Sequence, residues 1–284
     1  MILEIEDGLL YGIRGDDETI IIPEGVEVID RGIFHGSNVK NLQLPESLKR
    51  IKSYAFCRCE NLESVRIPDG VERIDAFAFA GCSNLKEINL PNALKRIRNS
   101  CFSGTLLERI RIPDSVTRIG PHAFSICKSL REVVLPGGLK EIMDEAFFCC
   151  EKLACIEIPK GTEFIGAYAF SDCTALESVV LNDGLEEIEN VAFLGCVSLK
   201  EIVLPPSLKR ISESAFCNCP ELMEIRMPEG VEVYKDDMVD VFDNGNSAVR
   251  TGKGQIYFYK DPFLAEIQPD NPFKGCSRAA VIAE

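Results

Sequence analysis

A proline recurs along the chain at intervals of 22 or 23 residues, and this interval constrains the fold more than any other feature. Six residues after each of the first nine markers stands an isoleucine, and eleven residues after each stands a phenylalanine. Self-similarity of this length is the signature of a repeat architecture. The markers are Pro23, Pro45, Pro68, Pro91, Pro113, Pro136, Pro159, Asn182 (in the one place where proline is missing), Pro205 and Pro228.

Each repeat predicts short strands and one compact turn. Residues 88–90 alternate apolar and polar side chains, which is typical of a strand, and the proline that follows ends it. A second alternation, as in residues 71–74, predicts another short strand. The pattern A-F-x-x-C-x-x-L then has the spacing of a short helical turn with one inward side. One repeat cannot close a core alone, so we predict a β-rich solenoid of about ten stacked coils.

The two ends of the chain depart from the repeat. Residues 1–18 predict a capping hairpin, and the solenoid is expected over residues 19–234. Residues 235–284 are interpreted as an irregular insertion followed by a degenerate capping repeat, all within a single domain. In that last part GQIYFYKDP predicts a strand, and Pro262, Phe273 and Cys276 restore the repeat spacing.

The chain has thirteen cysteines, and their positions follow the repeat. Sites built from cysteine usually cluster pairs of them with histidine or further cysteine, whereas here the coils contribute one each. We therefore predict buried free thiols that pack inside the coils, with no metal and no cofactor. Seven of them stand fourteen residues after a marker: Cys59, Cys82, Cys127, Cys150, Cys173, Cys196 and Cys219.

No motif predicts catalysis. His122 stands in a column that other repeats fill with residues such as Tyr54, Phe77, Tyr168 and Val191, so it is interpreted as a packing or surface residue. The segment Thr251–Gly254 resembles part of a phosphate-binding loop but lacks the required first glycine and the final serine or threonine. The chain is therefore predicted not to be an enzyme.

The consensus L-x-x-I-x-L-P-x-x-[VL]-x-x-I-x-x-x-A-F-x-x-C-x-x-L resembles the BspA-type leucine-rich repeat of bacteria. The likeness extends over residues 19 to about 233. It implies a right-handed solenoid with a strand-lined face and a protein-binding role. Many members of the family have export signals and surface anchors, and neither is seen in this sequence.

Charge and hydropathy limit the partners. The formal net charge is −14 and the sequence pI is about 4.8, which disfavours nucleic acid and anionic membranes as partners. No apolar run approaches the ~20 residues of a membrane span, so no membrane insertion is expected. The protein is predicted to be cytoplasmic if Met1 is the native start, and secreted or on the cell surface if an export signal has been removed. The oligomeric state is left open.

Two exposed columns are candidate binding surfaces. Arginine and exposed apolar groups together are typical of protein interfaces, although valine is also simply a good strand former. The first column lies two residues before the marker, and Arg109 lies beside this column. Together they give the candidate protein interface: Arg66, Arg109, Arg111, Val134, Val180 and Val203. The second lies five residues after the marker and forms a basic stripe of Arg50, Arg73, Arg96 and Arg118.

Four arginines on adjacent coils repel one another unless an acid lies between them. Glu72, in the adjoining column, is the expected acidic neighbour for one of them. Two interpretations of the stripe stay open, an acidic partner segment and a surface screened by solvent. We predict a non-catalytic scaffold that recognises another protein through the strand-lined face. The alternative is a bacterial surface adhesin for host matrix or glycan.

Overall fold

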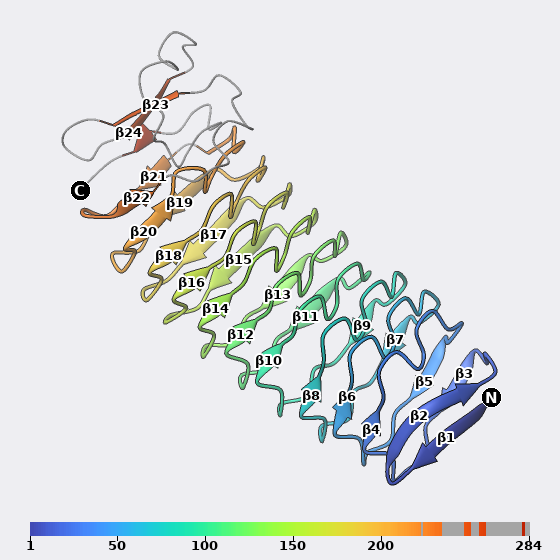
Figure 1. The fold of residues 1–284 in the computed structure, drawn as a ribbon. Coiled ribbons are helices and arrows are strands. Elements are labelled where there is room, and N and C mark those ends of the chain that lie inside the picture. The colour runs from blue at the N-terminus through green and yellow to red at the C-terminus, as the bar shows by residue number, and fades with distance from the viewer. Residues whose placement is uncertain (223, 235–246, 251–255, 260–279, 282–284) are drawn as a thin grey trace.

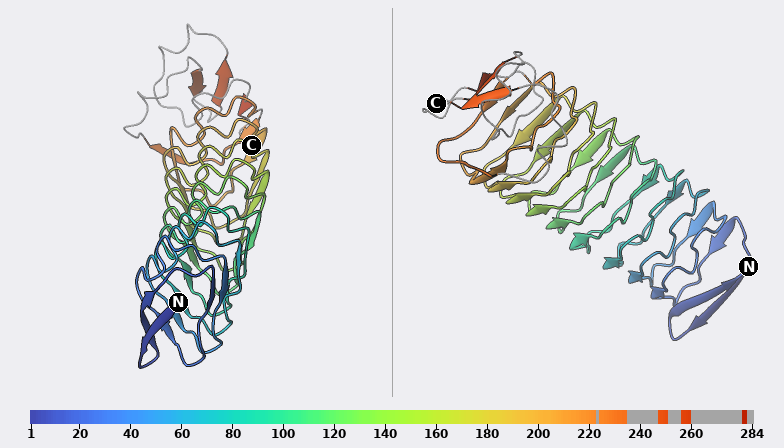
Figure 2. Two further views of the ribbon diagram at one scale, coloured as in Figure 1. Left: turned by 90° about the vertical axis from the view of Figure 1, so that its right-hand side faces the viewer. Right: turned by 45° about the horizontal axis from the view of Figure 1, so that its top comes forward.

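The structure, a computed structural model, describes residues 1–222, 224–234, 247–250, 256–259 and 280–281. The repeats stack as coils along one axis, so that each lies beside its neighbours in sequence (Figures 1 and 2). Every coil contributes two short strands and one segment of turns to three sides of the stack. This confirms a β-solenoid of about ten coils.

The strand that precedes the marker builds one side, the odd-strand face. Its side chains alternate, as in β15, where Cys155 and Glu157 are exposed while Ile156 and Ile158 are buried. The strands are β3 (Thr19–Ile21), β5 (Asn41–Gln43), β7 (Ser64–Val65), β9 (Glu87–Ile88), β11 (Arg109–Arg111), β13 (Glu132–Val134), β15 (Cys155–Ile158), β17 (Ser178–Leu181), β19 (Glu201–Val203) and β21 (Glu224–Arg226).

The strand that follows the marker builds a second side, the even-strand face. In β6 to β18 a buried isoleucine, six residues after the marker, follows a more exposed residue. The strands are β4 (Val28–Ile29), β6 (Arg50–Ile51), β8 (Arg73–Ile74), β10 (Arg96–Ile97), β12 (Arg118–Ile119), β14 (Glu141–Ile142), β16 (Phe164–Ile165), β18 (Glu187–Ile188), β20 (Arg210–Ser212) and β22 (Glu232–Tyr234).

The third side of each coil contains turns in place of the predicted short helical turn, which is wrong; the described residues contain no helix. Tyr54 and Arg58 have φ of 63° and 60°, and this left-handed backbone interrupts the run of right-handed residues that a helix needs. The Phe56 amide donates to the Ala78 carbonyl in the next coil at 2.9 Å, whereas the Cys57 amide donates to Tyr54 at 3.1 Å. Alternate amides therefore link coils instead of closing a helix.

A column of phenylalanines fills the centre of the stack. All nine rings are inaccessible to solvent, and neighbouring rings lie 5.0–5.9 Å apart between centroids with interplanar angles of 3–16°. Offset stacks at this spacing are favourable. The rings belong to Phe34, Phe56, Phe79, Phe102, Phe124, Phe147, Phe170, Phe193 and Phe216.

The cysteine column lies beside these rings, buried as predicted, and the twelve described cysteines are free thiols. Each of the seven column thiols donates to the carbonyl of the phenylalanine in the preceding coil, at Sγ···O distances of 3.0–3.3 Å. Burial raises the pKa of Cys127 to about 11 and also raises the pKa of Cys150, Cys173 and Cys196, whereas a hydrogen bond with Cys82 lowers the pKa of Cys59. Ser37 and Thr105 occupy the same position in the two 22-residue coils. The cysteines are therefore hydrogen-bond donors as well as packing residues.

The ladder of strands is interrupted on both faces at one place. The strands β8 and β10 belong to different hydrogen-bonded sheets, and so do β9 and β11. Only the third side keeps its ladder here, for example from the Phe79 amide to the Cys101 carbonyl at 3.0 Å. The ring pair Phe79–Phe102 is also the most widely spaced of the described stack, at 5.9 Å. We call this boundary between residues 68–90 and 91–112 the parted junction. The odd-strand face has a second interruption, between β13 and β15.

At the N-terminus an antiparallel hairpin, β1 (Ile2–Glu6) and β2 (Leu9–Arg14), extends the even-strand sheet, because β2 pairs in parallel with β4. At the other end β21 pairs with β25 (Ala280–Val281), which is followed in the sheet by β24 (Ile256–Tyr259) and β23 (Ser247–Arg250). The predicted strand in residues 254–262 is thus present as β24. The predicted positions Pro262, Phe273 and Cys276 lie outside the described residues, and the division into caps and solenoid stays a prediction.

Candidate functional site

The first candidate surface lies on the odd-strand face, where the predicted interface residues are exposed. Val134, Val180 and Val203 show 37%, 50% and 56% of their surface, and Ile21 in the same column shows 62%. These four are among nine large apolar side chains that are exposed in the described chain, and none of the nine lies on strands β4 to β22 of the even-strand face. Exposed apolar groups are thus concentrated in the predicted column.

The three candidate arginines of this face, Arg66, Arg109 and Arg111, lie on strands β7 to β11 or directly after them, before the candidate valines in the stack. Arg66 forms an ion pair with Glu46 at 2.8 Å, and Arg109 forms one with Glu132 at 3.6 Å. Arg111 pairs across the strands with Val134, so the basic and apolar parts of the column adjoin there. These surface ion pairs are weak in water and leave the arginines available for other contacts.

Two hollows open on the odd-strand face. One, of about 790 Å³, is lined by residues 64–66, 86–89, 108 and 109, where the strands part between β9 and β11. The other, of about 300 Å³, is lined by residues 178–181 and 201–203, so that Val180 and Val203 contribute to its wall. In that second hollow, the pairing of β17 with β19 is confined to Ser178 and Glu201. Arg66 and Arg109 thus line one depression and Val180 and Val203 line another, whereas Arg111 and Val134 line neither.

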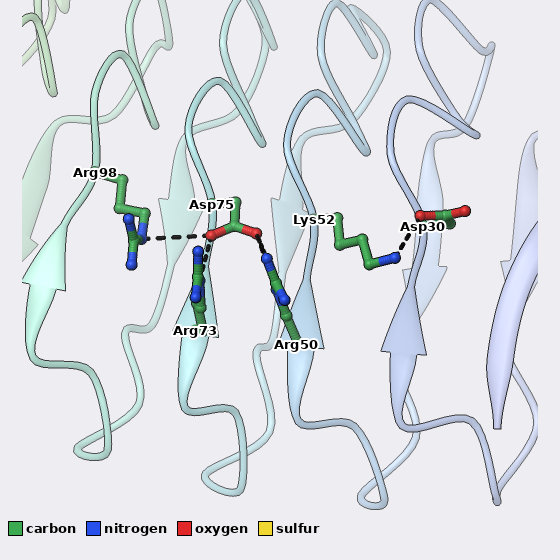
Figure 3. A network of polar contacts seen from close by, with 6 residues as sticks. All are labelled: Asp30, Arg50, Lys52, Arg73, Asp75 and Arg98. Atoms are coloured by element: carbon green, nitrogen blue, oxygen red, sulfur yellow. Dashed lines mark hydrogen bonds and ion pairs between the residues drawn. The ribbon is translucent and has the colours of Figure 1, made fainter.

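The second candidate surface, the basic stripe, lies on the even-strand face, and two of its arginines, Arg50 and Arg73, contact a buried acid (Figure 3). The Asp75 carboxylate, whose side chain is 6% exposed, accepts from Arg50 Nη2 at 2.6 Å and from Arg73 Nε at 2.5 Å. Arg98 Nε reaches it across the parted junction at 3.4 Å. Lys52 lies beside this group and pairs with its own acid, Asp30, at 2.8 Å. The acid among these arginines is Asp75, and the expectation for Glu72 was wrong.

Asp75 and Arg98 are functional candidates that the sequence reasoning missed. Both stand seven residues after a marker, two positions beyond Arg73 and Arg96 of the basic stripe. Asp75 directly follows strand β8 and Arg98 directly follows strand β10, and both side chains extend toward the stripe (Figure 3). The signal in the sequence was the charge of this neighbouring column, where an aspartate, Asp75, and an arginine, Arg98, stand on adjacent coils.

The electrostatics of Asp75 follow from these contacts. Burial opposes ionisation of the carboxylate, but hydrogen bonds from Arg73 and Arg50, with their charges, outweigh burial and lower its pKa. A lowered folded-state pKa means that the ionised group stabilises the fold above the ordinary carboxyl pKa of about 3.9. This contribution is lost as the pH falls through the lowered value.

The other two arginines of the basic stripe differ in their partners. Arg118 Nε pairs with Glu141 at 3.0 Å and its Nη2 contacts Met143 Sδ at 3.2 Å. The Arg96 side chain makes no hydrogen bond or ion pair with the residues that the structure describes. A hollow of about 330 Å³ is lined by Arg50, Arg73, Arg96, Arg98 and Arg118 together with Asp75, and we call these six residues with that hollow the basic hollow.

The described part of the chain contains no candidate metal site. No group of three or more histidine, cysteine, aspartate or glutamate side chains in it is placed to hold a metal ion. His122 Nδ1 lies 3.0 Å from a carboxylate oxygen of Glu145, on the turn side of the stack. Within the same residues, no helix is long and apolar enough to cross a membrane.

Comparisons with known proteins agree with this geometry. The family model of the BspA type leucine-rich repeat region matches residues 4–131 and 119–244, in six copies. A leucine-rich repeat protein from Bacteroides ovatus is 30% identical with a TM-score of 0.69, and the match covers 82% of this chain and 61% of that one. This chain thus corresponds to less than two thirds of the length of the Bacteroides protein.

A second solved structure, a leucine-rich repeat protein from Eubacterium ventriosum, is 22% identical with a TM-score of 0.51. The match covers 75% of this chain and 67% of that one, and at this identity it shows a shared fold alone. The search of curated proteins found no match. The family model covers most of the chain, and the coils, the phenylalanine stack and the buried cysteines follow its repeat. The chain therefore belongs to the BspA-type leucine-rich repeat family.

Proposed function

We propose that this chain is a non-catalytic binding scaffold that recognises another protein through its odd-strand face. The observation behind the proposal is the column of exposed apolar side chains, Ile21, Val134, Val180 and Val203, on a regular strand surface. Members of this repeat family are typically non-catalytic. Strand-lined faces of stacked repeats offer extended binding surfaces, and apolar residues with adjacent arginines are favoured at interfaces.

The arrangement supports a partner of particular chemistry. A complementary protein would present an acidic edge to Arg66, Arg109 and Arg111, and an apolar centre to Val134, Val180 and Val203. The arginines would act on the association rate and its salt dependence, because exposed charges steer encounter. The valines would hold the complex, because their desolvation contributes to the dissociation barrier.

The test measures binding kinetics of a partner captured from the native organism. Arg111→Glu is expected to slow association and to reduce its salt dependence, and Val180→Asp is expected to speed dissociation by about tenfold. Val197→Asp is the matched control, because Val197 is 42% exposed on the turn side of the stack. Normal binding of both odd-strand variants, or equal loss with Val197→Asp, would refute the proposal. A parallel deletion of residues 235–254 tests whether binding depends on that segment instead.

The alternative function, a surface adhesin for host matrix or glycan, makes a different prediction. It places the protein in the surface fraction of native cells and its ligand outside them, whereas an internal scaffold partitions with the cell contents. Fractionation of native cells followed by detection of the untagged protein separates the two.

A further inference from the structure

The basic hollow is a second site, on a different face from the one proposed to bind protein. Its arginines come from four successive coils: Arg50, Arg73, Arg96 with Arg98, and Arg118. Arg50, Arg73 and Arg98 gather around Asp75 from both sides of the parted junction (Figure 3). Stacked coils thereby bring together five guanidinium groups that span 69 positions of the sequence, from residue 50 to residue 118.

The five arginines that line this hollow carry more positive charge than the nearby carboxylates neutralise. Asp75 is the one carboxylate among the lining residues, and Glu141 beyond the rim pairs with Arg118. Burial lowers the pKa of Arg98, and the positive charge of Arg73 lowers it further. The negative charge of Asp75 raises this pKa, and the charges of Arg96 and Arg50 lower it again. An excess of cations is thus concentrated on a chain whose net charge is −14.

Many donors of these guanidinium groups also stay available. Each guanidinium has five N–H groups, and Asp75 accepts hydrogen bonds from two of Arg50 and one of Arg73, while Arg98 contacts it as an ion pair at 3.4 Å. Arg96 uses none on the described residues, although it lines the hollow. Guanidinium groups match the oxygens of phosphate in planar, often bidentate hydrogen bonds.

We propose that the basic hollow binds a compact anion of the phosphate class that carries two or more negative charges. The volume of about 330 Å³ is at the small end of ligand sites, which suits a compact ion better than an extended acidic chain. A phosphoryl group has more acceptor oxygens than the carboxylate of Asp75, so it can accept from Arg96 and from its neighbours at once. Because Arg73 and Arg96 lie on opposite sides of the parted junction, such an anion would link the two sheets there.

The test uses isothermal titration of the full chain with inorganic pyrophosphate, at about 25 mM and about 200 mM salt. Wild-type protein is expected to bind, more weakly at the higher salt. Arg96→Gln is expected to weaken binding at least about tenfold, because it removes charge-assisted hydrogen bonds. This substitution breaks no side-chain hydrogen bond or ion pair with a described residue, so an unchanged melting temperature should accompany the loss.

Arg210→Gln is the matched control, since Arg210 stands in the same column but pairs with Glu187 and Glu232. It is expected to leave pyrophosphate binding within about twofold of wild type. Orthophosphate and succinate, titrated in parallel, are expected to bind more weakly than pyrophosphate. Three results would overturn the proposal: no pyrophosphate binding up to about 1 mM at low salt, equal loss in Arg210→Gln, or tighter binding of succinate or an oligoglutamate peptide. None of these results bears on the odd-strand face.

Discussion

The phenylalanine stack makes a quantitative prediction about where stability resides. Phe124 is inaccessible to solvent and is stacked on both sides, 5.5 Å from Phe102 and 5.4 Å from Phe147. Phe124→Ala should lower the free energy of unfolding by about 3–5 kcal/mol, which combines lost burial with the cavity left behind. The two ring contacts contribute about 0.5–1.5 kcal/mol each.

Position in the stack should change this cost in a predictable way. Phe34, also inaccessible, stacks on one described ring, Phe56 at 5.0 Å, so Phe34→Ala should cost about 0.5–1.5 kcal/mol less. Phe148 is the matched control, because it is half-buried and has no stacked ring among the described residues. Phe148→Ala should cost about 1–2 kcal/mol.

The assay is urea denaturation of the three variants, combined with amide hydrogen exchange. Exchange is needed because stacked repeats can unfold in parts, and a single transition then misreports the loss. Protection should fall most in the coil of residues 113–135 and in its two neighbours for Phe124→Ala. Equal losses for Phe124→Ala and Phe148→Ala, or for Phe124→Ala and Phe34→Ala, would show that the rings do not form one continuous core.

Two further predictions concern the polar groups of the interior. Cys173→Val should destabilise more than Cys173→Ser, because serine can still donate to the Phe147 carbonyl, as the thiol does at 3.3 Å; equal unfolding free energies would refute a role for the hydrogen bond. Asp75→Asn should cost about 1–3 kcal/mol at pH 7, and the difference from wild type should shrink as the pH falls below about 4, because the carboxylate is protonated first in the unfolded chain and then, below its lowered pKa, in the folded protein. A difference independent of pH, measured by thermal melts from pH 2 to 7, would refute the ionised network.

Much of the fold could be predicted because its columns are set by local spacing. The strands, the buried isoleucines and phenylalanines, and the cysteine column follow from alternation and from a period that repeats every coil. The third side could not be predicted in this way. Apolar spacings of three and four residues suit a helical turn, but they do not show that Tyr54 and Arg58 adopt the left-handed conformation. Hydrogen bonds to the next coil stabilise those turns, and such bonds are absent from any single repeat.

The candidate sites divide in the same way between local and long-range causes. Exposure of Val180 and Val203 follows from strand alternation, which a sequence displays directly. The contacts of Asp75 depend on how far the side chains of Arg50 and Arg98 extend toward it from the two adjacent coils. An aligned sequence does not give these distances.

The parted junction has a cause that lies beyond coil length. The coil of residues 91–112 is one residue short, yet the coil of residues 23–44 is equally short and its strands stay paired on both faces. Two differences distinguish the junction: three arginines, Arg50, Arg73 and Arg98, meet at Asp75 from its two sides, and the ring spacing there is the widest of the described stack, 5.9 Å. Repulsion between like charges on neighbouring strands does not by itself part them, because Arg50 stands opposite Arg73 and Arg96 opposite Arg118 on strands that stay paired. The stack thus has, at this one junction, both a gap between strands on each face and an excess of arginine charge. A bound anion would fill the gap on the even-strand face and neutralise that charge.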